Sequence, residues 1–372
     1  MKTKILFIAS EFASGMIPFA AKIITLLNKN TDFDVYAIVV NSGRKSYKEA
    51  LQGMDACHLV QIEYPKSKWL KLCYKIYPYS IIRAIRRIEK KQCPNVVHLL
   101  TGDFTLAPYL FFRRNTDRWY YTVHDLHPHE TKSNSFFNTL LHKYIIWGYK
   151  ILRDNVANLT TSSQSQYLEL KNLYPNKHVS FTHFPSLLTP QIQTGDRTVK
   201  ELMGEKKDYI LFFGTVDEYK GVDLLINAYL HSERLRNYKL VIAGKGLDYV
   251  SLINGNENII RINRFIDDAE VKDLFTKSLF VVYPYRSATM SGVLSIAYYF
   301  KRRVLLSNIP FFMDNATAAS TFFECGNISD LKAKMELMVS DKYDAPTLND
   351  CYEKIYSEEV MVNDYYKLYS SK

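Results

Sequence analysis

The feature that most constrains the fold is an alternation of short apolar runs with segments of helical periodicity. The first run, Lys4–Ala9, is followed directly by a helical pattern over Ile17–Leu27. Similar runs follow at Asp34–Val40, Val96–Leu100, Trp119–Val123 and Asn158–Thr161. Continuous apolar runs of this length are typical of strands buried on both faces, so the pattern predicts a parallel, doubly wound α/β sheet.

The same alternation begins again in the second half of the chain. Strands are expected at Tyr209–Phe213, Tyr238–Ala243, Ile259–Ile262, Leu279–Tyr283 and Val304–Ser307, with helices such as Val222–Tyr229 and Asp268–Lys277 between them. Between Leu188 and Lys207 the sequence is polar and shows no sustained hydrophobic period, which is typical of a linker. Because 372 residues exceed what one hydrophobic core usually holds, two domains are expected.

These patterns give domain boundaries. We expect an N-terminal Rossmann-like domain over residues 1–190, a linker over 191–205 and a second Rossmann-like domain over 206–350. Residues 351–372 contain a helical pattern at Tyr352–Tyr369, which we expect to pack back toward the N-terminal domain.

Composition narrows the class of protein. A hydrophobic fraction of 47% with 23% charged residues is typical of a globular chain. No apolar run reaches the roughly 18 residues that span a bilayer, and Glu11 interrupts the first apolar run before it could act as a secretion signal. A cytoplasmic location is therefore predicted. The five cysteines form no CxxC pair and no Cys/His cluster with metal-ligand spacing, so we expect reduced, mostly buried thiols.

The net charge of +10 indicates a nucleic acid, an anionic membrane or a phosphorylated substrate as partner. Part of this charge is concentrated between Lys66 and Lys91, where only Glu89 opposes it. The basic residues are Lys66, Lys68, Lys71, Lys75, Arg83, Arg86, Arg87, Lys90 and Lys91. Aromatic and aliphatic residues interleave them, as in a surface that rests on acidic lipid headgroups. An ordinary solvated helix with one buried side gives the same pattern. No nucleic-acid module surrounds the segment, so a nucleic-acid partner is not expected.

Ligands of open parallel sheets collect at the carboxyl ends of the strands, so the strand exits are the places to search. The exit of the first strand, Ser10–Met16, lacks a GxGxxG turn, which argues against a dinucleotide-dependent oxidoreductase. Ser14 and Gly15 in this loop, together with Asp103, are candidates for acceptor binding. The fourth exit carries His124, Asp125, His127 and His129. An active-site role, a purely structural role and a metal site are all compatible with these histidines.

In the second half, three strand exits carry groups suited to phosphate. Gly214 is followed by Lys220 just before a helix, where an ammonium group can meet a phosphate as a point charge. Gly244 lies in a glycine turn after the next strand. A third exit runs from Tyr283 through Arg286, Thr289, Ser291 and Gly292 into an apolar helix, the kind of segment whose backbone N–H groups form an anion nest.

Taken in order, these segments resemble the GT-B glycosyltransferases of the large retaining group called family 4, or glycosyl transferases group 1. The resemblance is strongest in FFGTVDEYKGVDLLINAY, LVIAGKG, RFIDDAEVKDLF and YPYRSATMSGVLSIAYYF. It implies two Rossmann-like domains that face each other across a cleft, with the acceptor bound by the first domain and the nucleotide sugar by the second. It also implies that no metal and no cofactor are needed beyond a nucleoside diphosphate sugar as co-substrate.

Residue by residue, the resemblance implies roles for the second half and for one histidine. The donor-binding candidates are Gly214, Lys220, Gly244, Arg264, Phe265, Arg286, Thr289, Ser291, Gly292 and Val293. Lys220 is expected on the diphosphate, and the Arg264–Phe265 segment beside the nucleobase. His124, with Asp125, is expected near the transferring sugar.

The sequence departs from the family pattern at three positions. Thr215 stands where the family commonly has an arginine, and Ala288 and Ile296 stand where it commonly has glutamates. A similar SAT-x-SGV loop occurs in one branch of the family. The departures motivate an alternative, a catalytically inactive GT-B scaffold of a glycan-assembly complex. A nucleotide-sugar epimerase on the same fold is a third interpretation.

The function expected from the resemblance is transfer of a sugar, of the hexosyltransferase kind (EC 2.4), to a glycan or lipid-linked acceptor. The basic segment adds the expectation of a peripheral position on the inner face of the plasma membrane, in bacterial surface polysaccharide assembly.

Overall fold

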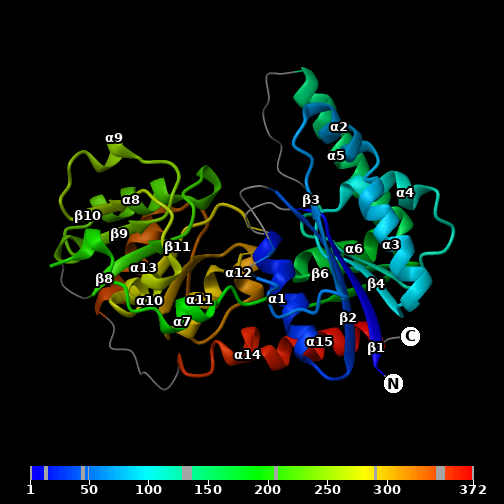
Figure 1. Cartoon of the computed structure of the whole chain (residues 1–372). Helices are drawn as coiled ribbons and strands as arrows, with labels where there is room; N and C mark the ends of the chain where they lie inside the picture. The colour runs from blue at the N-terminus through cyan, green and yellow to red at the C-terminus, as the bar shows by residue number, and fades with distance from the viewer. Residues whose placement is uncertain are drawn as a thin grey trace. The chain divides into compact units, whose positions relative to one another are not determined.

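The computed structural model describes residues 2–11, 16–42, 47–48, 50–127, 136–204, 208–288, 291–340 and 348–370. The chain forms two compact units. The first comprises residues 1–185 and 361–372, and the second comprises residues 186–360. Both are parallel α/β sheets covered by helices, as the alternation in the sequence predicts (Figure 1).

The first unit is built on a seven-stranded sheet with the order β3-β2-β1-β4-β5-β6-β7. Its strands are β1 (Thr3–Ala9), β2 (Phe33–Asn41), β3 (Leu59–Glu63), β4 (Val96–Leu99), β5 (Trp119–Thr122), β6 (Asn158–Thr161) and β7 (His178–Phe181). Its helices are α1 (Met16–Lys29), α2 (Lys68–Ile76), α3 (Tyr79–Gln92), the 3-10 helix η1 (Phe104–Leu106), α4 (Ala107–Phe111), α5 (Phe136–Asn155) and α6 (Gln164–Leu173).

Alternate residues of β1 face opposite sides of this sheet, as the two-residue period of a strand requires. Leu6 and Ile8 belong to a core that also contains Ile81, Ile85 and Leu152 from the helices on that side. On the other side the Phe7 ring lies beside His98, and His98 is hydrogen bonded to Tyr369 near the end of the chain. Both faces of the sheet are therefore covered.

The second unit has a six-stranded parallel sheet with the order β10-β9-β8-β11-β12-β13. Its strands are β8 (Tyr209–Phe213), β9 (Leu240–Ala243), β10 (Ile259–Ile262), β11 (Ser278–Tyr283), β12 (Arg303–Ser307) and β13 (Ser320–Phe323). The helices are α7 (Pro190–Thr194), η2 (Lys200–Leu202), η3 (Glu218–Lys220), α8 (Val222–Leu230), η4 (Leu235–Asn237), α9 (Val250–Ile253), α10 (Asp268–Thr276), α11 (Val293–Tyr299), α12 (Pro310–Asp314), α13 (Ile328–Ser340) and α14 (Glu353–Tyr356).

The stretch expected to be a linker, 191–205, is instead part of the second unit. Ile192, Val199 and Leu202 are buried in its core, and the Thr189 side chain caps α7 by accepting a hydrogen bond from the Ile192 N–H. These three apolar residues, isolated in an otherwise polar sequence, anchor the segment to the core of the second unit. They follow no single period, which is why the sequence pattern predicts a linker.

The terminal helix also differs from the expectation of one continuous helix. It is divided into α14 and α15 (Glu358–Ser370) at Ser357, whose backbone is extended at φ −62° and ψ 152°. The Ser357 hydroxyl accepts a hydrogen bond from the Val360 N–H and so caps α15. Residues from Met361 onward belong to the first unit, whereas α14 belongs to the second.

Candidate functional site

In each sheet, the strand order reverses direction next to the first strand of the unit. This point lies between β1 and β4 in the first unit and between β8 and β11 in the second. The loops at the carboxyl ends of these strands diverge and leave room for a ligand. Most of the candidate residues lie on these loops.

Three glycines bring the strand exits of the second unit into backbone contact. A Cβ on Gly244 would lie 1.8 Å from the Gly214 carbonyl oxygen, and one on Gly221 would lie 2.1 Å from the Pro284 carbonyl oxygen. Gly214, Gly221 and Gly244 all have positive φ, at 133°, 63° and 143°. Only glycine fits such positions without strain. The loops after β8, β9 and β11 are thereby held together.

Lys220 lies at the centre of this arrangement. Its side chain is 7% exposed and its ammonium group donates to the Thr215 hydroxyl at 2.7 Å. No salt bridge to a carboxylate is found for it among the residues that the structure describes. Burial lowers the pKa of Lys220 to about 8, although the nearby Asp217 charge raises it. The group is therefore a buried cation, mostly protonated at pH 7, without an anionic partner of its own.

Other side chains converge on the same space. A Cβ on Gly214 would lie 3.5 Å from the Lys220 Nζ, 3.8 Å from the Val293 Cγ1 and 3.9 Å from the Tyr285 hydroxyl. Tyr285 is 1% exposed, and the Ser291 side chain is a hydrogen-bond partner of its hydroxyl. Burial raises the pKa of Tyr285 above its usual value, although the Ser291 hydrogen bond lowers it, so this hydroxyl is a donor over the physiological range. Gly214, Lys220 and Val293 are thus brought together as expected, and Tyr285 joins them.

Ser291 and Gly292 immediately precede α11. A Cβ on Gly292 would lie 2.2 Å from the Leu187 Cγ, so a larger residue at this position would force the Leu187 side chain to move. Thr289 lies outside the described residues. Ile296, where the family commonly has a glutamate, is 3% exposed and packs in the core, so no carboxylate is present at that place in α11.

Two arginines expected at the donor site are tied to carboxylates. The Arg286 guanidinium contacts Asp223 at 2.6 and 2.8 Å and donates to the Glu218 carbonyl oxygen. Arg264 makes paired hydrogen bonds to Glu201 and Glu270, each between 2.7 and 2.8 Å. The Glu201 hydrogen bond and then the Glu270 one raise the pKa of Arg264.

These ion pairs fix the loops that carry the two arginines. Phe265, next to Arg264, is 79% exposed and offers its ring face to a flat ligand such as a nucleobase. The donor roles of Arg264, Phe265 and Arg286 stay predictions.

The corresponding edge of the first unit carries acids rather than a lysine. Asp103 is 1% exposed and accepts hydrogen bonds from the Ser10 N–H, the Ser10 hydroxyl and the Thr101 N–H. Glu11 accepts from the Gly102 N–H at 2.9 Å. Burial raises the pKa of both carboxyl groups, and in Glu11 the charge of Asp103 adds to the rise.

These bonds link the exits of β1 and β4. The Asp103 carboxyl is buried and already accepts hydrogen bonds from Ser10 and Thr101, so it holds the loop in place. Its role in binding the acceptor stays a prediction. The two other acceptor candidates, Ser14 and Gly15, lie outside the described residues.

His124 occupies the exit of β5. Its Nε2 lies 2.6 Å from the Leu100 carbonyl oxygen, and since a carbonyl only accepts, Nε2 carries the proton. Burial lowers the pKa of His124 to about 4, so the ring is neutral. Its Nδ1 is buried and has no hydrogen-bond partner within the residues described. A neutral imidazole with one free nitrogen can accept a hydrogen bond from a sugar hydroxyl.

Gln166, on α6, holds the segment that carries His124 and the half-buried Asp125. Its amide donates to the His124 carbonyl oxygen at 3.2 Å and accepts from the Leu126 N–H at 2.6 Å. The sequence pattern did not single out Gln166 because a glutamine in a helix carries no motif. His127 is exposed and pairs with Glu169, and His129 lies outside the described residues. His124 and His127, the described histidines of this loop, thus contact different groups, the Leu100 carbonyl oxygen and Glu169.

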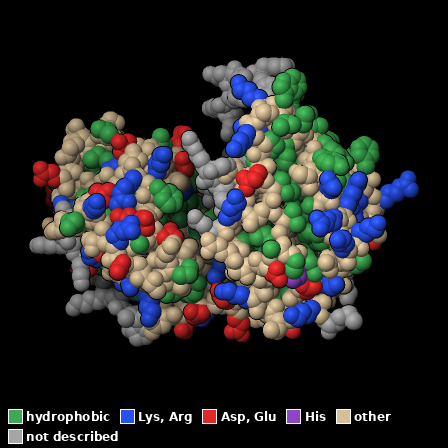
Figure 2. All heavy atoms as spheres, in the orientation of Figure 1, with side chains coloured by type: hydrophobic (Ala, Val, Ile, Leu, Met, Phe, Trp, Pro, Cys, Tyr) green, Lys and Arg blue, Asp and Glu red, His purple; other side chains and the backbone are tan. Residues whose placement is uncertain are grey.

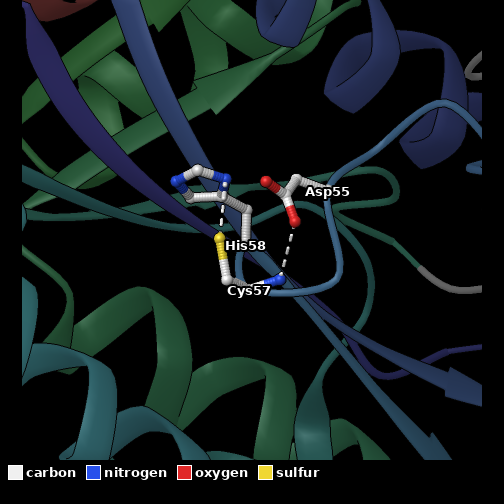
Figure 3. A group of neighbouring side chains, drawn as sticks. All are labelled: Asp55, Cys57 and His58. Atoms are coloured by element: carbon white, nitrogen blue, oxygen red, sulfur yellow. Dashed lines mark hydrogen bonds between the residues drawn. The ribbon is translucent and has the colours of Figure 1, made fainter.

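A different group of side chains offers metal ligands. Asp55, Cys57 and His58 place a carboxylate oxygen, a thiol and a ring nitrogen within 4.8 Å of one another (Figure 3). Sγ of Cys57 lies 3.6 Å from Nδ1 of His58, and Asp34 pairs with the other ring nitrogen at 3.4 Å. Cys57, like Cys73 and Cys93, is exposed, whereas the sequence predicts mostly buried thiols. The sequence pattern predicts no Cys/His cluster, because Asp55, Cys57 and His58 are neighbours and show no spaced motif. They precede β3, at the amino end of the sheet, and so lie apart from the strand exits.

Known proteins resemble this chain in part of its sequence and in its fold. Residues 196–358 match the family model described as Glycosyl transferases group 1. The second unit therefore carries a glycosyltransferase group 1 domain, and the chain has the GT-B fold. No curated protein matches it by sequence.

Solved structures show the fold over the whole chain. HepE from Anabaena in complex with UDP and glucose is similar at 14% identity and a TM-score of 0.72, with complete coverage of both chains. The lipopolysaccharide outer core galactosyltransferase WaaB is similar at 13% identity and a TM-score of 0.67, with 99% of each chain covered. A putative UDP-N-acetylglucosamine 2-epimerase from Listeria monocytogenes is similar at 13% identity and a TM-score of 0.64, with 100% of this chain and 96% of the other covered.

Proposed function

We propose that the second unit binds a nucleoside diphosphate sugar and that its sugar is transferred to a hydroxyl group of a glycan or lipid-linked acceptor held by the first unit. The observation that carries this proposal is the buried ammonium group of Lys220, which lacks a carboxylate partner among the described residues and faces a glycine-lined space. Burying a charge without a partner is costly, so a bound anion is the natural complement.

The chemistry follows from where charge develops. The acceptor oxygen forms a bond to the anomeric carbon, the bond from that carbon to the diphosphate breaks, and its electron pair leaves on the diphosphate oxygen. The acceptor proton passes to that oxygen. Lys220 stabilises the charge that develops there, and the Tyr285 hydroxyl is close enough to Gly214 to donate to the same group. We propose that the transfer retains the anomeric configuration and needs no metal ion.

His124 and Asp125 are proposed to act on the sugar side of the reaction. Since burial keeps His124 neutral, it supplies a hydrogen-bond acceptor rather than a positive charge. The ring of His124 is oriented by the hydrogen bond from its Nε2 to the Leu100 carbonyl oxygen. Its backbone is held by Gln166, whose amide donates to the His124 carbonyl oxygen.

The location proposed for this activity is the cytoplasmic face of a membrane, in bacterial surface polysaccharide assembly. The basic segment 66–91 supports it, and so does the fold shared with WaaB. Among the described residues, no helix has the length and apolar character to cross a bilayer.

The experiment that tests the proposal is calorimetry with uridine and guanosine diphosphates, followed by a screen of nucleotide sugars for transfer or hydrolysis. We expect one nucleotide to bind and one class of sugar to be consumed. Transfer that persists with excess chelator supports the metal-independent form. An inactive scaffold would show no turnover, and an epimerase would change the sugar while it stays on the nucleotide.

A further inference from the structure

The exposed surface of the first unit contains an unusual concentration of large apolar side chains. In α2 only Tyr74 is buried, while Trp69, Leu70 and Ile76 are 78%, 59% and 53% exposed. Phe111 and Phe112, at the end of α4, are 53% and 82% exposed. The helix pair 66–91 is therefore not one uniform solvated surface. Its second helix, α3, buries an isoleucine face, whereas α2 presents its apolar residues to solvent.

Cations surround these apolar side chains. Figure 2 shows hydrophobic and basic side chains intermingled over the part of the first unit where Figure 1 labels α2, α3 and α4. Contiguous apolar patches on a monomer mark interaction surfaces. Apolar residues flanked by lysine and arginine complement one partner in particular, an acidic bilayer.

A cavity of about 590 Å³ lies between α3 and α4 within this surface. It is lined by Tyr77, Arg86, Glu89, Lys90, Pro108, Tyr109, Phe112 and Arg113. Arg113 contacts Glu89 at 2.8 and 3.1 Å, and Arg118 joins the same carboxylate at 3.2 Å. The one acid of the cavity is therefore already paired.

Unlike Arg113, the two other basic residues of the cavity wall, Arg86 and Lys90 on α3, are not paired with an acid within the described residues. The Arg86 guanidinium lies 5.5 Å from the centre of the Tyr109 ring. They lie one helical turn apart on α3, so both point to the same side. The cavity thus combines two available cations with the exposed rings of Tyr77 and Phe112 at its edge.

We propose that this cavity binds the phosphate headgroup of an acidic phospholipid, with Arg86 and Lys90 as its ligands, while Trp69 and Phe112 insert into the bilayer. A site with charge inside and apolar rings at its edge fits a molecule with an anionic head and an apolar tail. The inference deepens the proposed membrane location and rests on it, but it does not depend on the transfer reaction.

Vesicle sedimentation tests the proposal with the intact chain. We expect binding to phosphatidylcholine vesicles that contain phosphatidylglycerol, and little binding to pure phosphatidylcholine. The double variant R86Q/K90Q should weaken partitioning by roughly thirtyfold, since each basic residue at an acidic surface contributes about a factor of five.

The matched control is R83Q/K91Q, which removes the same charge from the same helix but lines a different cavity. Its loss should be several times smaller, because that cavity is lined by residues of β2, β3 and α3 and by none of the residues proposed to face the bilayer. Equal losses for the two double variants would overturn the headgroup site and leave only diffuse attraction. Equal binding of the native protein to both kinds of vesicle would overturn the membrane surface altogether.

Tryptophan fluorescence tests the insertion separately. Trp119 is buried, whereas Trp69 and Trp147 are 78% and 41% exposed. When acidic vesicles are added, W69F should therefore lose most of the shift to shorter wavelength, and the control W147F should keep most of it. An unchanged shift in W69F would contradict insertion. The urea unfolding midpoint should be the same for R86Q/K90Q and the native protein, which shows that the first unit, where both residues lie, is folded. Binding of uridine diphosphate by the second unit should also be unchanged. If no nucleotide binds but vesicles do, the proposed transfer fails while this inference stands.

Discussion

The two sheets have the same topological reversal, yet the groups at the two reversal points have opposite electrostatic character. In the second unit the point carries the buried cation Lys220 among glycines. In the first unit it carries the buried Asp103 and the half-buried Glu11, with the neutral ring of His124 one strand away. The shared fold thus offers one edge suited to a diphosphate and one suited to uncharged hydroxyl groups. Fold alone does not set the ligand, and the side chains at the strand exits do.

The strongest test of this contrast is Lys220→Met. Loss of the ammonium group should lower kcat/KM by roughly 10² to 10³ fold, because the charge acts on the departing diphosphate. The control is Lys245→Met on the exposed turn after β9, which should change little. Steady-state kinetics with the donor found by the screen measures both. Turnover unaffected by the first substitution would remove the assignment of Lys220.

The pH dependence of nucleotide binding tests the same edge. Since the pKa of Lys220 is lowered to about 8, the free protein loses this positive charge as pH rises through 8. Affinity for uridine diphosphate should therefore be full near pH 7 and fall by up to about tenfold per pH unit above 8. Calorimetry from pH 7 to 9.5 measures it, and Lys220→Met should remove most of the slope.

The glycine contacts of the second unit give the next largest effect. Gly244→Ala should destabilise that unit by about 3 kcal/mol and weaken nucleotide binding, since its Cβ would meet the Gly214 carbonyl oxygen at a positive φ. Gly255→Ala is the matched control. It also has positive φ, at 70°, but nothing lies within 4 Å of the added Cβ, so about 1 kcal/mol is expected. Equal losses in urea unfolding would show that the backbone contact is unimportant.

The stability of the first unit should instead depend on acid pH. Burial lowers the pKa of His98 to about 3 and that of His124 to about 4, whereas an unfolded histidine takes a proton near 6.5. The unfolded chain therefore binds more protons below pH 6.5, and stability should decrease as pH falls from 6.5 to 4. Urea midpoints across this range measure the effect. The double variant H98Q/H124Q should have a shallower slope, and an unchanged slope would assign the acid sensitivity to other groups.

The smallest expected effect concerns α15. Tyr369→Phe removes the hydroxyl that lies 2.7 Å from the His98 Nδ1 and should cost about 1 kcal/mol. The ring remains, so its contacts with Phe33 and Tyr120 are kept. Unfolding by urea measures the loss, and Tyr366→Phe, whose hydroxyl contacts the solvent-exposed Asp32, should lose less.

The sequence predicted the central strands well, because residues such as Ile5–Ala9 and Tyr209–Phe212 are buried on both faces and so form continuous apolar runs. The edge strands β3, β7 and β13 were missed because they are half-exposed and show no such run. Lys220 could be singled out from its place after a strand. Tyr285 could not, because a tyrosine at the end of an apolar strand has the same pattern whether its hydroxyl is paired or free.

The division of the C-terminal segment has a consequence for the order of folding. The second unit is one continuous stretch of chain, 186–360, whereas the face of the first unit's sheet that α1 covers in part is completed only when residues 361–370 are added. Tyr365, Leu368 and the Tyr369 hydrogen bond to His98 all come from this late segment. During synthesis, the first unit therefore cannot complete its fold until the whole second unit has been made. Its sheet leaves the ribosome first and is completed last.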